Sequence, residues 1–352
     1  MQPLNFAVIG AGNIGKIQAE AIRHIPAARV TVVCNRGEAV GRALAEKHDA
    51  HWVADFQEAV TRGDVDVVTI CTPSATHTEI AVAAAAAGKH LLVEKPIDVT
   101  LPRIDQILQA VEKAGVVLAC VFPLRFALGV HKAKEALAAG RLGRLTMAGA
   151  YVKWFRPQSY YDNSWRGTWA LDGGGALMNQ AIHNIDLLQW LAGPVESILA
   201  RTATLAHTMQ TEDTASAVLT FKSGALGVIQ GATSCWPGDR ARVELHGDRG
   251  TIVLEEGRIV VWKLADAAPG EEEAMLALEQ QQGSGAADPT AIGYEMHRRQ
   301  IVDLIEAIQQ GRPPAIQGTE ARQSVEIIRA IYVAASQQRL VTLPLVDQIT
   351  PV

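Results

Sequence analysis

Among the residues of this chain, Lys95 has the type and the position best suited to polar chemistry. It lies in Glu94-Lys95-Pro96, directly after the apolar run His90–Val93 and well downstream of the glycine turn Gly10-Ala-Gly-Asn-Ile-Gly15. A lysine in this setting would lie at the carboxyl edge of a parallel sheet, where open α/β folds bind their ligands. A glycine turn of this spacing is typical of dinucleotide binding, so the combination predicts a redox enzyme.

The glycine turn follows an apolar run at 5–9 and precedes a helical pattern. The first glycine permits a tight turn, the second lets the backbone approach a pyrophosphate, and the third lets the helix pack closely. The N-terminus of that helix then faces the negative charge. We therefore predict that Gly10, Gly12, Asn13, Ile14 and Gly15 contact a nicotinamide dinucleotide.

The end of the next predicted strand bears on the choice between NAD and NADP. Asn35 stands where an enzyme that uses NAD usually carries Asp or Glu for the ribose 2′-hydroxyl, and Arg36 follows it. A guanidinium can pair with the 2′-phosphate of NADP, whereas a carboxylate would repel it. The pair therefore favours NADP slightly among the NAD(P) cofactors, although Arg36 could instead stack on adenine and Asn35 could bond the hydroxyl.

Strands and helices alternate over the first 120 or so residues. The predicted strands are unbroken Val, Ile and Leu runs, which is typical of a parallel sheet covered on both faces. They lie at 5–9, 29–34, 65–71, 90–93 and 116–121, with helices near 14–25, 38–48, 76–87 and 101–114. This pattern predicts an α/β fold whose residues 1–123 form a Rossmann-type, doubly wound dinucleotide-binding domain.

The pattern changes after a helix predicted at 127–139. Strand-length apolar segments with short, Gly-containing connections favour an antiparallel sheet. They lie at 145–152, 195–204, 215–221, 225–233, 241–246 and 251–254. We predict a mobile loop at 265–288, two closing helices at 294–310 and 320–337, and a short strand or tail at 341–345, all within a second domain over 124–352.

The composition is that of a globular protein, with 48% hydrophobic residues and a formal net charge of −5. That balance offers no cationic surface for nucleic acid or anionic lipid, so neither partner is expected. The four cysteines lack the paired spacing of a zinc site, which predicts reduced thiols and no metal. Because the first residues run straight into a strand without a leader pattern, we expect a cytoplasmic location.

Several of these segments together resemble the Gfo/Idh/MocA oxidoreductases. The resemblance rests on motifs spread over essentially the whole chain, which are Gly10–Gly15, Thr72-Pro73-Ser74 with His77, the stretch 87–90 before Glu94-Lys95-Pro96, the stretch 173–186, and 311–314 with 343–345 in the tail. It implies a C-terminal α/β domain with a large open, mainly antiparallel sheet that often forms a subunit interface. A homodimer or homotetramer through that sheet is the implied assembly.

The resemblance also assigns residues by position. Lys95 corresponds to the family's lysine beside the nicotinamide and His183 to its proposed acid/base, while Thr72, Pro73, His77 and Glu94 fall in its cofactor motifs. The family often carries an aspartate four residues before the histidine, where this chain has Asn179. That departure removes a carboxylate from the proton path and places more of the acid/base work on His183.

Helical spacing supports a polar face around these residues. Asn179, His183 and Asp186 project opposite an apolar stripe if the segment is a regular helix. A neutral imidazole suits proton removal from an alcohol, and Lys95 can stabilise the charge that develops on the substrate oxygen. Asp186 could orient the imidazole, or it could serve a solvent-facing or helix-pairing role.

An aromatic segment lies just before this helix. Three of the seven tryptophans and three of the five tyrosines fall between Tyr151 and Trp169. Aromatic faces accept the C–H faces of a sugar ring, and an arginine can hold a carboxylate or phosphate. We predict Tyr161, Trp165 and Arg166 as substrate contacts, together with Asn179 and His183.

The leading functional prediction is an NAD(P)-dependent dehydrogenase or reductase that acts on a CH–OH group of a sugar, sugar derivative or cyclitol. One alternative is a glycoside hydrolase that uses tightly held NAD for transient oxidation at C3. A second is a non-catalytic sensor of NAD(P) and sugar, although a sensor has no need of both Lys95 and His183.

Overall fold

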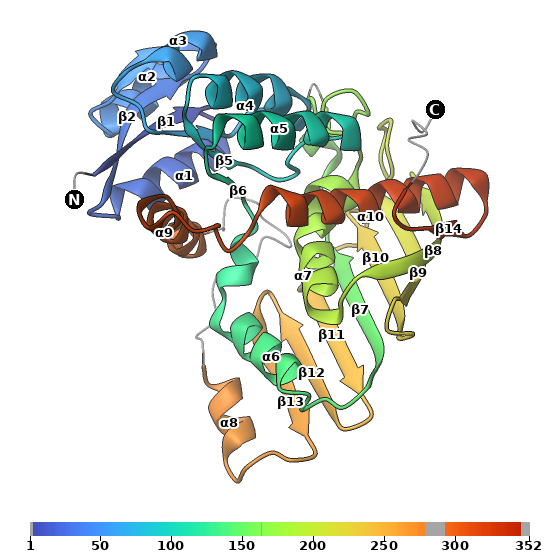
Figure 1. Ribbon diagram of the computed structural model, residues 1–352. Coiled ribbons are helices and arrows are strands. Elements are labelled where there is room, and N and C mark those ends of the chain that lie inside the picture. Colours follow the sequence, from blue (N-terminus) through green and yellow to red (C-terminus); the bar gives the residue numbers. More distant parts are fainter. Residues whose placement is uncertain (1–2, 163, 279–292, 346–352) are drawn as a thin grey trace. The chain divides into compact units, whose positions relative to one another are not determined.

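The computed structural model describes residues 3–162, 164–278 and 293–345 (Figure 1). The chain forms two compact units, one of Met1–Pro123 with Gly293–Arg322 and the other of Leu124–Ile292 with Gln323–Val352. The predicted boundary after residue 123 thus omits the return of Gly293–Arg322 to the first unit. The physical reason is visible in the core, where Ile301, Leu304 and Ile305 are buried among residues of the first sheet and its helices.

The first unit contains a six-stranded sheet in the order β3-β2-β1-β4-β5-β6, and every neighbouring pair is parallel. Its strands are β1 Leu4–Ile9, β2 Ala28–Cys34, β3 His51–Val53, β4 Val67–Ile70, β5 His90–Val93 and β6 Leu118–Cys120. Its helices are α1 Asn13–Arg23, α2 Glu38–Lys47, α3 Phe56–Thr61, η1 Ser74–Thr76, α4 His77–Ala86, α5 Leu101–Ala114 and α9 Glu295–Gln310, with the first turn of α10 Gly318–Gln337.

This sheet confirms the predicted Rossmann topology. All residues of β4 are buried, as expected for a strand covered on both faces. The strand order reverses between β1 and β4, and ligands of such sheets bind outside the carboxyl ends of the strands at that point. The glycine turn after β1 and Thr72 after β4 therefore lie at the ligand-binding edge.

The second unit contains an eight-stranded sheet in the order β13-β12-β11-β7-β10-β9-β8-β14. Its strands are β7 Leu145–Lys153, β8 Val195–Ala203, β9 Thr214–Phe221, β10 Leu226–Ala232, β11 Arg242–Gly247, β12 Gly250–Glu255, β13 Arg258–Leu264 and β14 Val341–Thr342. Pairs are antiparallel except β7 with β10. This confirms the predicted large, mainly antiparallel sheet.

The helices of the second unit are α6 Leu128–Ala138, α7 Ile182–Ala192, α8 Glu271–Leu276 and the part of α10 from Gln323 onward, with the short helices η2 Pro123–Phe126, η3 Gln158–Tyr160 and η4 Leu177–Ala181. Helix α7 packs on β7 and β11, and α6 packs on β12 and β13 (Figure 1). The same sheet exposes apolar side chains of its central strands, including Val218 and Leu226. The sheet is therefore only partly covered by its own helices.

Two elements differ from the predictions for this unit. The predicted loop at 265–288 contains helix α8, whose Glu271 is held by Arg141 and by the indole of Trp262; residues 279–288 lie outside the described part. Strand β13 was not predicted, although Ile259 and Trp262 in it are apolar and buried. Helix α8 is held by Arg141, which is distant in sequence, whereas β13 pairs with the neighbouring strand β12 in a hairpin.

Candidate active site

The three glycines of the first turn are explained by different structural requirements. Gly10 has a φ of +103°, and a Cβ there would lie 2.5 Å from the carbonyl oxygen of Cys71; a Cβ on Gly15 would overlap with the carbonyl oxygen of Gly10. A Cβ on Gly12 would meet no protein atom within 4 Å. Packing therefore explains Gly10 and Gly15, whereas the Gly12 position fits the close approach of a bound group to the backbone.

The start of α1 suits an anionic group. Gly12 is the N-cap of α1, no side chain caps the helix, and its first turn carries no acidic residue. The exposed Asn13 and the half-buried Ile14 begin the helix. Orphan amides at a helix N-terminus bind phosphate well, so these residues fit the pyrophosphate of a dinucleotide.

Asn35 is built into the glycine turn. Its Oδ1 accepts a hydrogen bond from the backbone N–H of Ala11 at 3.1 Å, and its Nδ2 donates to the carbonyl of Gly37 at 2.8 Å. Arg36 is exposed beside it. Asn35 thus fixes the loop that precedes α1, and the next side chain available at this end of β2 is the guanidinium of Arg36.

His77 joins the loops that follow β4 and β5. Its Nε2 lies 3.0 Å from the carbonyl oxygen of Thr72 and its Nδ1 lies 2.9 Å from that of Pro96. Burial lowers the pKa of His77, although bonds to these carbonyls and the nearby Asp98 oppose that shift. The side chain is 1% exposed, so His77 positions the two loops from inside and does not itself face a ligand.

Glu94 is a buried carboxyl directly before Lys95. Its Oε1 accepts a hydrogen bond from Nε2 of Gln18 at 2.6 Å, and its Oε2 lies 3.3 Å from the backbone N–H of Lys95. Burial raises the pKa of Glu94 to about 7, and its interactions with Gln18 and Lys95 oppose the rise. Lys95 is half-buried, and Thr72 and Pro73 are half-buried in the loop after β4.

In the second unit, the glycine run before α7 is required by packing. A Cβ on Gly174 would overlap with the hydroxyl of Tyr332, and a Cβ on Gly175 would overlap with the carbonyl oxygen of Glu212. Glu212 also receives the backbone N–H of Gly175 at 3.0 Å, the N–H of Leu177 at 2.9 Å and the hydroxyl of Tyr332 at 3.0 Å. Burial raises the pKa of Glu212 to about 7. Sequence reasoning missed this carboxyl, since it lies far from α7 in the sequence.

Asn179 lies on η4, a π-helical turn over Leu177–Ala181, and His183 lies at the start of the α-helix that continues it. Both side chains are half-buried. The sequence predicted one regular helix, but a π turn changes the angular spacing of the residues it contains, and such turns are frequent at functional sites. Nδ2 of Asn179 donates to Oδ1 of Asp172 at 2.8 Å.

The position of Asp186 contradicts the prediction that its side chain projects from the same side of the helix as those of Asn179 and His183. Its carboxylate is fully buried and pairs with the guanidinium of Arg125 through two bonds of 2.7 Å, while the hydroxyl of Ser324 donates to it at 3.0 Å. A solvent-facing role is therefore wrong. Its bonds to Arg125 and Ser324 tie α7 to η2 and α10, which is a structural function.

The aromatic segment divides into interior and half-buried residues. Tyr161 is 7% exposed and its hydroxyl donates to Thr233 at 2.7 Å, which argues against the prediction that it contacts substrate. Trp165 and Arg166 are half-buried. The guanidinium of Arg166 lies over the rings of Tyr160 at 4.5 Å and Trp165 at 5.3 Å. Tyr160, which was not predicted, thus takes the place beside Arg166.

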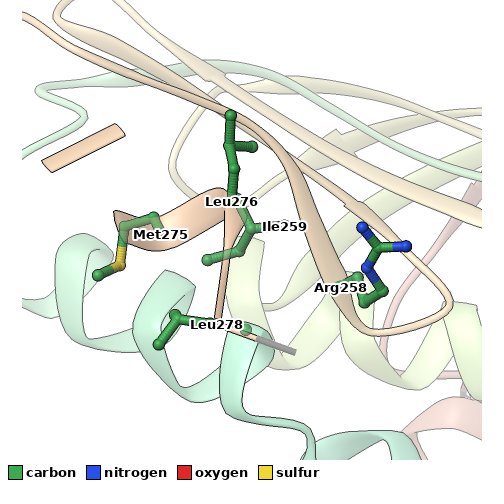
Figure 2. Close-up of a pocket in the computed structure, with 6 residues that line it drawn as sticks. Arg258, Ile259, Met275, Leu276 and Leu278 are labelled. Carbon is green, nitrogen blue, oxygen red and sulfur yellow. The ribbon is translucent and has the colours of Figure 1, made fainter. Parts of the chain in front are cut away.

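Figure 2 shows a small hollow elsewhere in the second unit. It is lined by Gly129, Arg258, Ile259, Met275, Leu276 and Leu278. None of these residues is a predicted site residue. Among the described residues, no group of three or more His, Cys, Asp or Glu side chains could hold a metal ion, all four cysteines are free, and no helix is long and apolar enough to cross a membrane.

Comparison with known proteins identifies the family from both units. Residues 4–122 match an oxidoreductase family with an NAD-binding Rossmann fold, and residues 130–253 match the GFO/IDH/MocA C-terminal domain. The chain belongs to the Gfo/Idh/MocA family. This confirms the predicted family and its fold, and it makes the protein an NAD(P)-dependent oxidoreductase, as predicted.

Relatives in the Gfo/Idh/MocA family match this chain from end to end. It is 28% identical to the myo-inositol 2-dehydrogenase of Thermotoga maritima, over 97% of this chain and 98% of that protein. It is 25% identical to the levoglucosan dehydrogenase of Pseudarthrobacter phenanthrenivorans, over 98% and 99%. The crystal structure of the WlbA dehydrogenase from Bordetella pertussis, in complex with NADH and UDP-GlcNAcA, is 31% identical with a TM-score of 0.88, over 98% of this chain and 99% of that chain.

Proposed function

We propose that this protein is a dehydrogenase that transfers hydride between NAD(P) and a secondary alcohol or ketone on the ring of a sugar, sugar derivative or cyclitol. The observation that carries the proposal is the similarity, over nearly the whole length, to enzymes named for inositol and levoglucosan. Lys95 after β5 and His183 on α7 supply the polar groups that such a reaction needs.

Lys95 and His183 have different roles toward the substrate oxygen. NAD(P), held by the glycine turn and the start of α1, supplies the hydride acceptor for alcohol oxidation. The ammonium of Lys95 donates a hydrogen bond to the substrate oxygen and stabilises its developing negative charge. The imidazole of His183 accepts the hydroxyl proton, since the nitrogen of a neutral imidazole can act as a general base.

The segment around Arg166 supports a more specific substrate. A guanidinium that lies over two aromatic rings is pre-oriented, and it binds carboxylate or phosphate in a planar, bidentate manner. Trp165 and Tyr160 offer ring faces next to it. We therefore include acidic sugars and sugar nucleotides among the candidate substrates; the WlbA structure contains UDP-GlcNAcA.

Arg36 is the basis of a proposal about the cofactor. Because Asn35 is bonded to Ala11 and Gly37, its amide offers less to a ribose hydroxyl than a carboxylate would. The exposed Arg36 can pair with a 2′-phosphate. We expect NADP to bind at least as tightly as NAD, although the similar WlbA structure contains NADH.

The second sheet supports self-association. Leu199, Val218, Met147 and Leu226 are between 49% and 57% exposed. They come from adjacent strands, since Leu199 pairs with Val218 and Met147 pairs with Leu226. Exposed apolar groups that lie together on one sheet mark an interaction surface. We propose a second copy of the chain as the occupant, giving a homodimer or homotetramer.

A substrate screen tests the proposed function. The purified protein is incubated with NAD or NADP and with cyclitols, neutral sugars, uronic acids and UDP-sugars, and nicotinamide absorbance is followed. We expect turnover with at least one ring alcohol. Lys95→Met and His183→Ala should each lower kcat by roughly 10²–10⁴, the range for a positioned proton-transfer group.

Matched surface variants control for nonspecific damage. Lys132→Met changes a half-buried lysine of α6, and His246→Ala changes a half-buried histidine of β11. Both should retain wild-type turnover. Near-normal turnover by the His183 variant would refute its acid/base role, and product formation without net NAD(P)H change would favour the hydrolase alternative.

A further inference from the structure

Trp52 lies on β3 beside the end of β2, and neither the motifs nor the family resemblance singled it out. Its indole nitrogen donates a hydrogen bond to the backbone carbonyl of Asn35 at 3.1 Å. The guanidinium of Arg42 lies over its rings, 4.4 Å from the ring centroid, and the side chain is half-buried. Trp52 therefore connects β3 to the residue that directly follows β2.

Helix α2 leaves room for this indole at Gly41. A Cβ on Gly41 would overlap with the indole nitrogen of Trp52, and it would lie 3.1 Å from Cβ of Asn35. Glycine inside a helix is less favourable than alanine, and here the space that the indole occupies explains it. The position of the indole is thus set from two sides, by α2 and by the carbonyl of Asn35.

The bond from Trp52 fixes the direction of the whole peptide unit between Asn35 and Arg36. This unit is trans, and in a planar trans peptide the N–H points opposite to the carbonyl. Because the carbonyl of Asn35 faces Trp52, the backbone N–H of Arg36 faces away from Trp52. Among the described residues, no protein acceptor takes that N–H.

The side of β2 away from Trp52 is the side of the glycine turn. In the sheet, β3 and β1 flank β2 on opposite sides, and the glycine turn follows β1. Asn35 is joined to that turn, since its Oδ1 accepts the backbone N–H of Ala11 at 3.1 Å. The end of β2 beside such a turn is where Rossmann domains hold the adenosine ribose of a dinucleotide.

We propose that Trp52 is a positioning residue for the cofactor: it holds the Asn35–Arg36 peptide so that the backbone N–H of Arg36 donates a hydrogen bond to the oxygen at the ribose 2′ position. In NAD that oxygen belongs to a hydroxyl, and in NADP it belongs to a phosphate, whose charge makes the bond stronger. Trp52 acts only through this peptide and does not itself touch the cofactor. The inference rests on the proposed binding of a dinucleotide at the glycine turn, and it concerns the main chain of Arg36 instead of its guanidinium.

The first measurement compares two tryptophans by titration with NADPH and NADH. Trp52→Phe removes the indole N–H and keeps an aromatic ring under Arg42. We expect the Kd of NADPH to rise about tenfold, as for a weakened bond to a charged group, and the Kd of NADH about threefold.

Trp262→Phe is the matched control, because it removes the bond of 3.0 Å from the indole N–H of Trp262 to Glu271 in the second unit. It should leave both constants within about twofold of wild type. Each variant should melt about 3 °C or less below wild type, since each loses one hydrogen bond. Unchanged constants in Trp52→Phe, or equal losses in the two variants, would overturn the proposal.

Gly41→Ala tests the same indole from the side of α2. The added Cβ displaces the indole while its N–H is kept, so the Kd of NADPH should again rise about tenfold. In Gly41→Ala/Trp52→Phe the alanine should add little further loss, because no indole remains to be displaced. Effects that simply multiply in the double variant would contradict the proposal. Gly41→Ala also decides the question if Trp52→Phe does not fold.

The Arg36→Ala background separates the main chain from the guanidinium. Alanine keeps the backbone N–H, so Trp52→Phe should still raise the Kd of NADPH about tenfold in this background. If it causes no further loss there, Trp52 acts through the guanidinium and the proposal is wrong. If the wild-type protein binds neither NADPH nor NADH, the proposed function fails together with this inference, whereas binding that is insensitive to Trp52→Phe refutes the inference alone.

Discussion

Glu94 adjoins Lys95 in the sequence, whereas Glu212 lies 37 and 35 residues from the amides of Gly175 and Leu177 that it receives and 120 residues from Tyr332. Both carboxyls are buried, and burial raises the pKa of each to about 7. In the first unit the buried carboxyl directly precedes its candidate residue, and it is also held by Gln18, 76 residues away in the sequence. The second unit supports Asn179 and His183 through contacts between distant segments, so the two units should respond differently to substitution.

Glycine substitutions give the largest expected difference between the units. Gly175→Ala adds a Cβ that overlaps with the carbonyl of Glu212, so we expect a loss of about 3 kcal/mol or more in unfolding free energy. Gly12→Ala meets no protein atom, so stability should change little while NADH affinity falls about tenfold, or about 1.4 kcal/mol. Denaturant unfolding and NADH fluorescence titration measure the two effects. A stable Gly175→Ala protein would contradict the packing explanation.

The two sheets are expected to differ in association. The first sheet has both faces covered, whereas Val218 in the second is 57% exposed beside Leu199. Val218→Glu should shift the protein from a dimer or tetramer toward monomer, because it places a charge in an apolar contact. Light scattering after size exclusion reports the mass. Arg23→Glu, on an exposed residue of α1 in the first unit, is the control, and a wild-type protein that is already monomeric would refute the assembly.

The two buried carboxyls, Glu94 and Glu212, should make the free energy of unfolding depend on pH. Each has a folded pKa near 7 against an ordinary value of 4.5, so the native state binds the proton more tightly. Their contribution to stability is present below about pH 4.5 and is lost as pH rises through 7, by an amount on the order of 3 kcal/mol for each group. Urea unfolding between pH 4.5 and 8 measures this slope.

Replacing Glu94 and Glu212 in turn by glutamine should change the free energy of unfolding to different extents. Glu94→Gln still accepts the bond from Gln18 and replaces only the oxygen whose bond to the Lys95 N–H is long, at 3.3 Å, so it should flatten the pH slope with the smaller loss at pH 7. Glu212→Gln turns one of two accepting oxygens into a donor that faces a backbone N–H or the hydroxyl of Tyr332, which costs about 1–3 kcal/mol. Equal effects of both substitutions at pH 7 would contradict the distinction drawn between the two carboxyls.

Arg36→Ala should have the smallest effect on binding, because the Arg36 side chain is exposed. NADP affinity should fall about fivefold, as for a solvent-screened ion pair, while NAD affinity should hardly change. Titrations at low and moderate salt measure both constants, and the difference should shrink as salt rises. An equal loss for both cofactors, or a tenfold preference of the wild type for NAD, would remove the proposed role of Arg36.

The sequence alone determined most of the first unit and its candidate residues. Buried strands such as β4 read as apolar runs, and the spacing of Gly10, Gly12 and Gly15 follows from a local turn before a helix. The family motifs also located Lys95 and His183. These features depend on neighbours within a few residues, so their physical cause is contained in a short stretch of chain.

The tertiary structure decided the features that depend on distant segments. In the folded protein α9 packs in the core of the first unit, Tyr161 is buried with its hydroxyl bonded to Thr233, and Asp186 pairs with Arg125. The π turn that carries Asn179, and the carboxylate of Asp172 that holds it, follow from hydrogen bonds that no periodic pattern encodes. A polar side chain finds its partner only when the chain has folded, and burial then fixes that pairing because an unsatisfied polar group is costly.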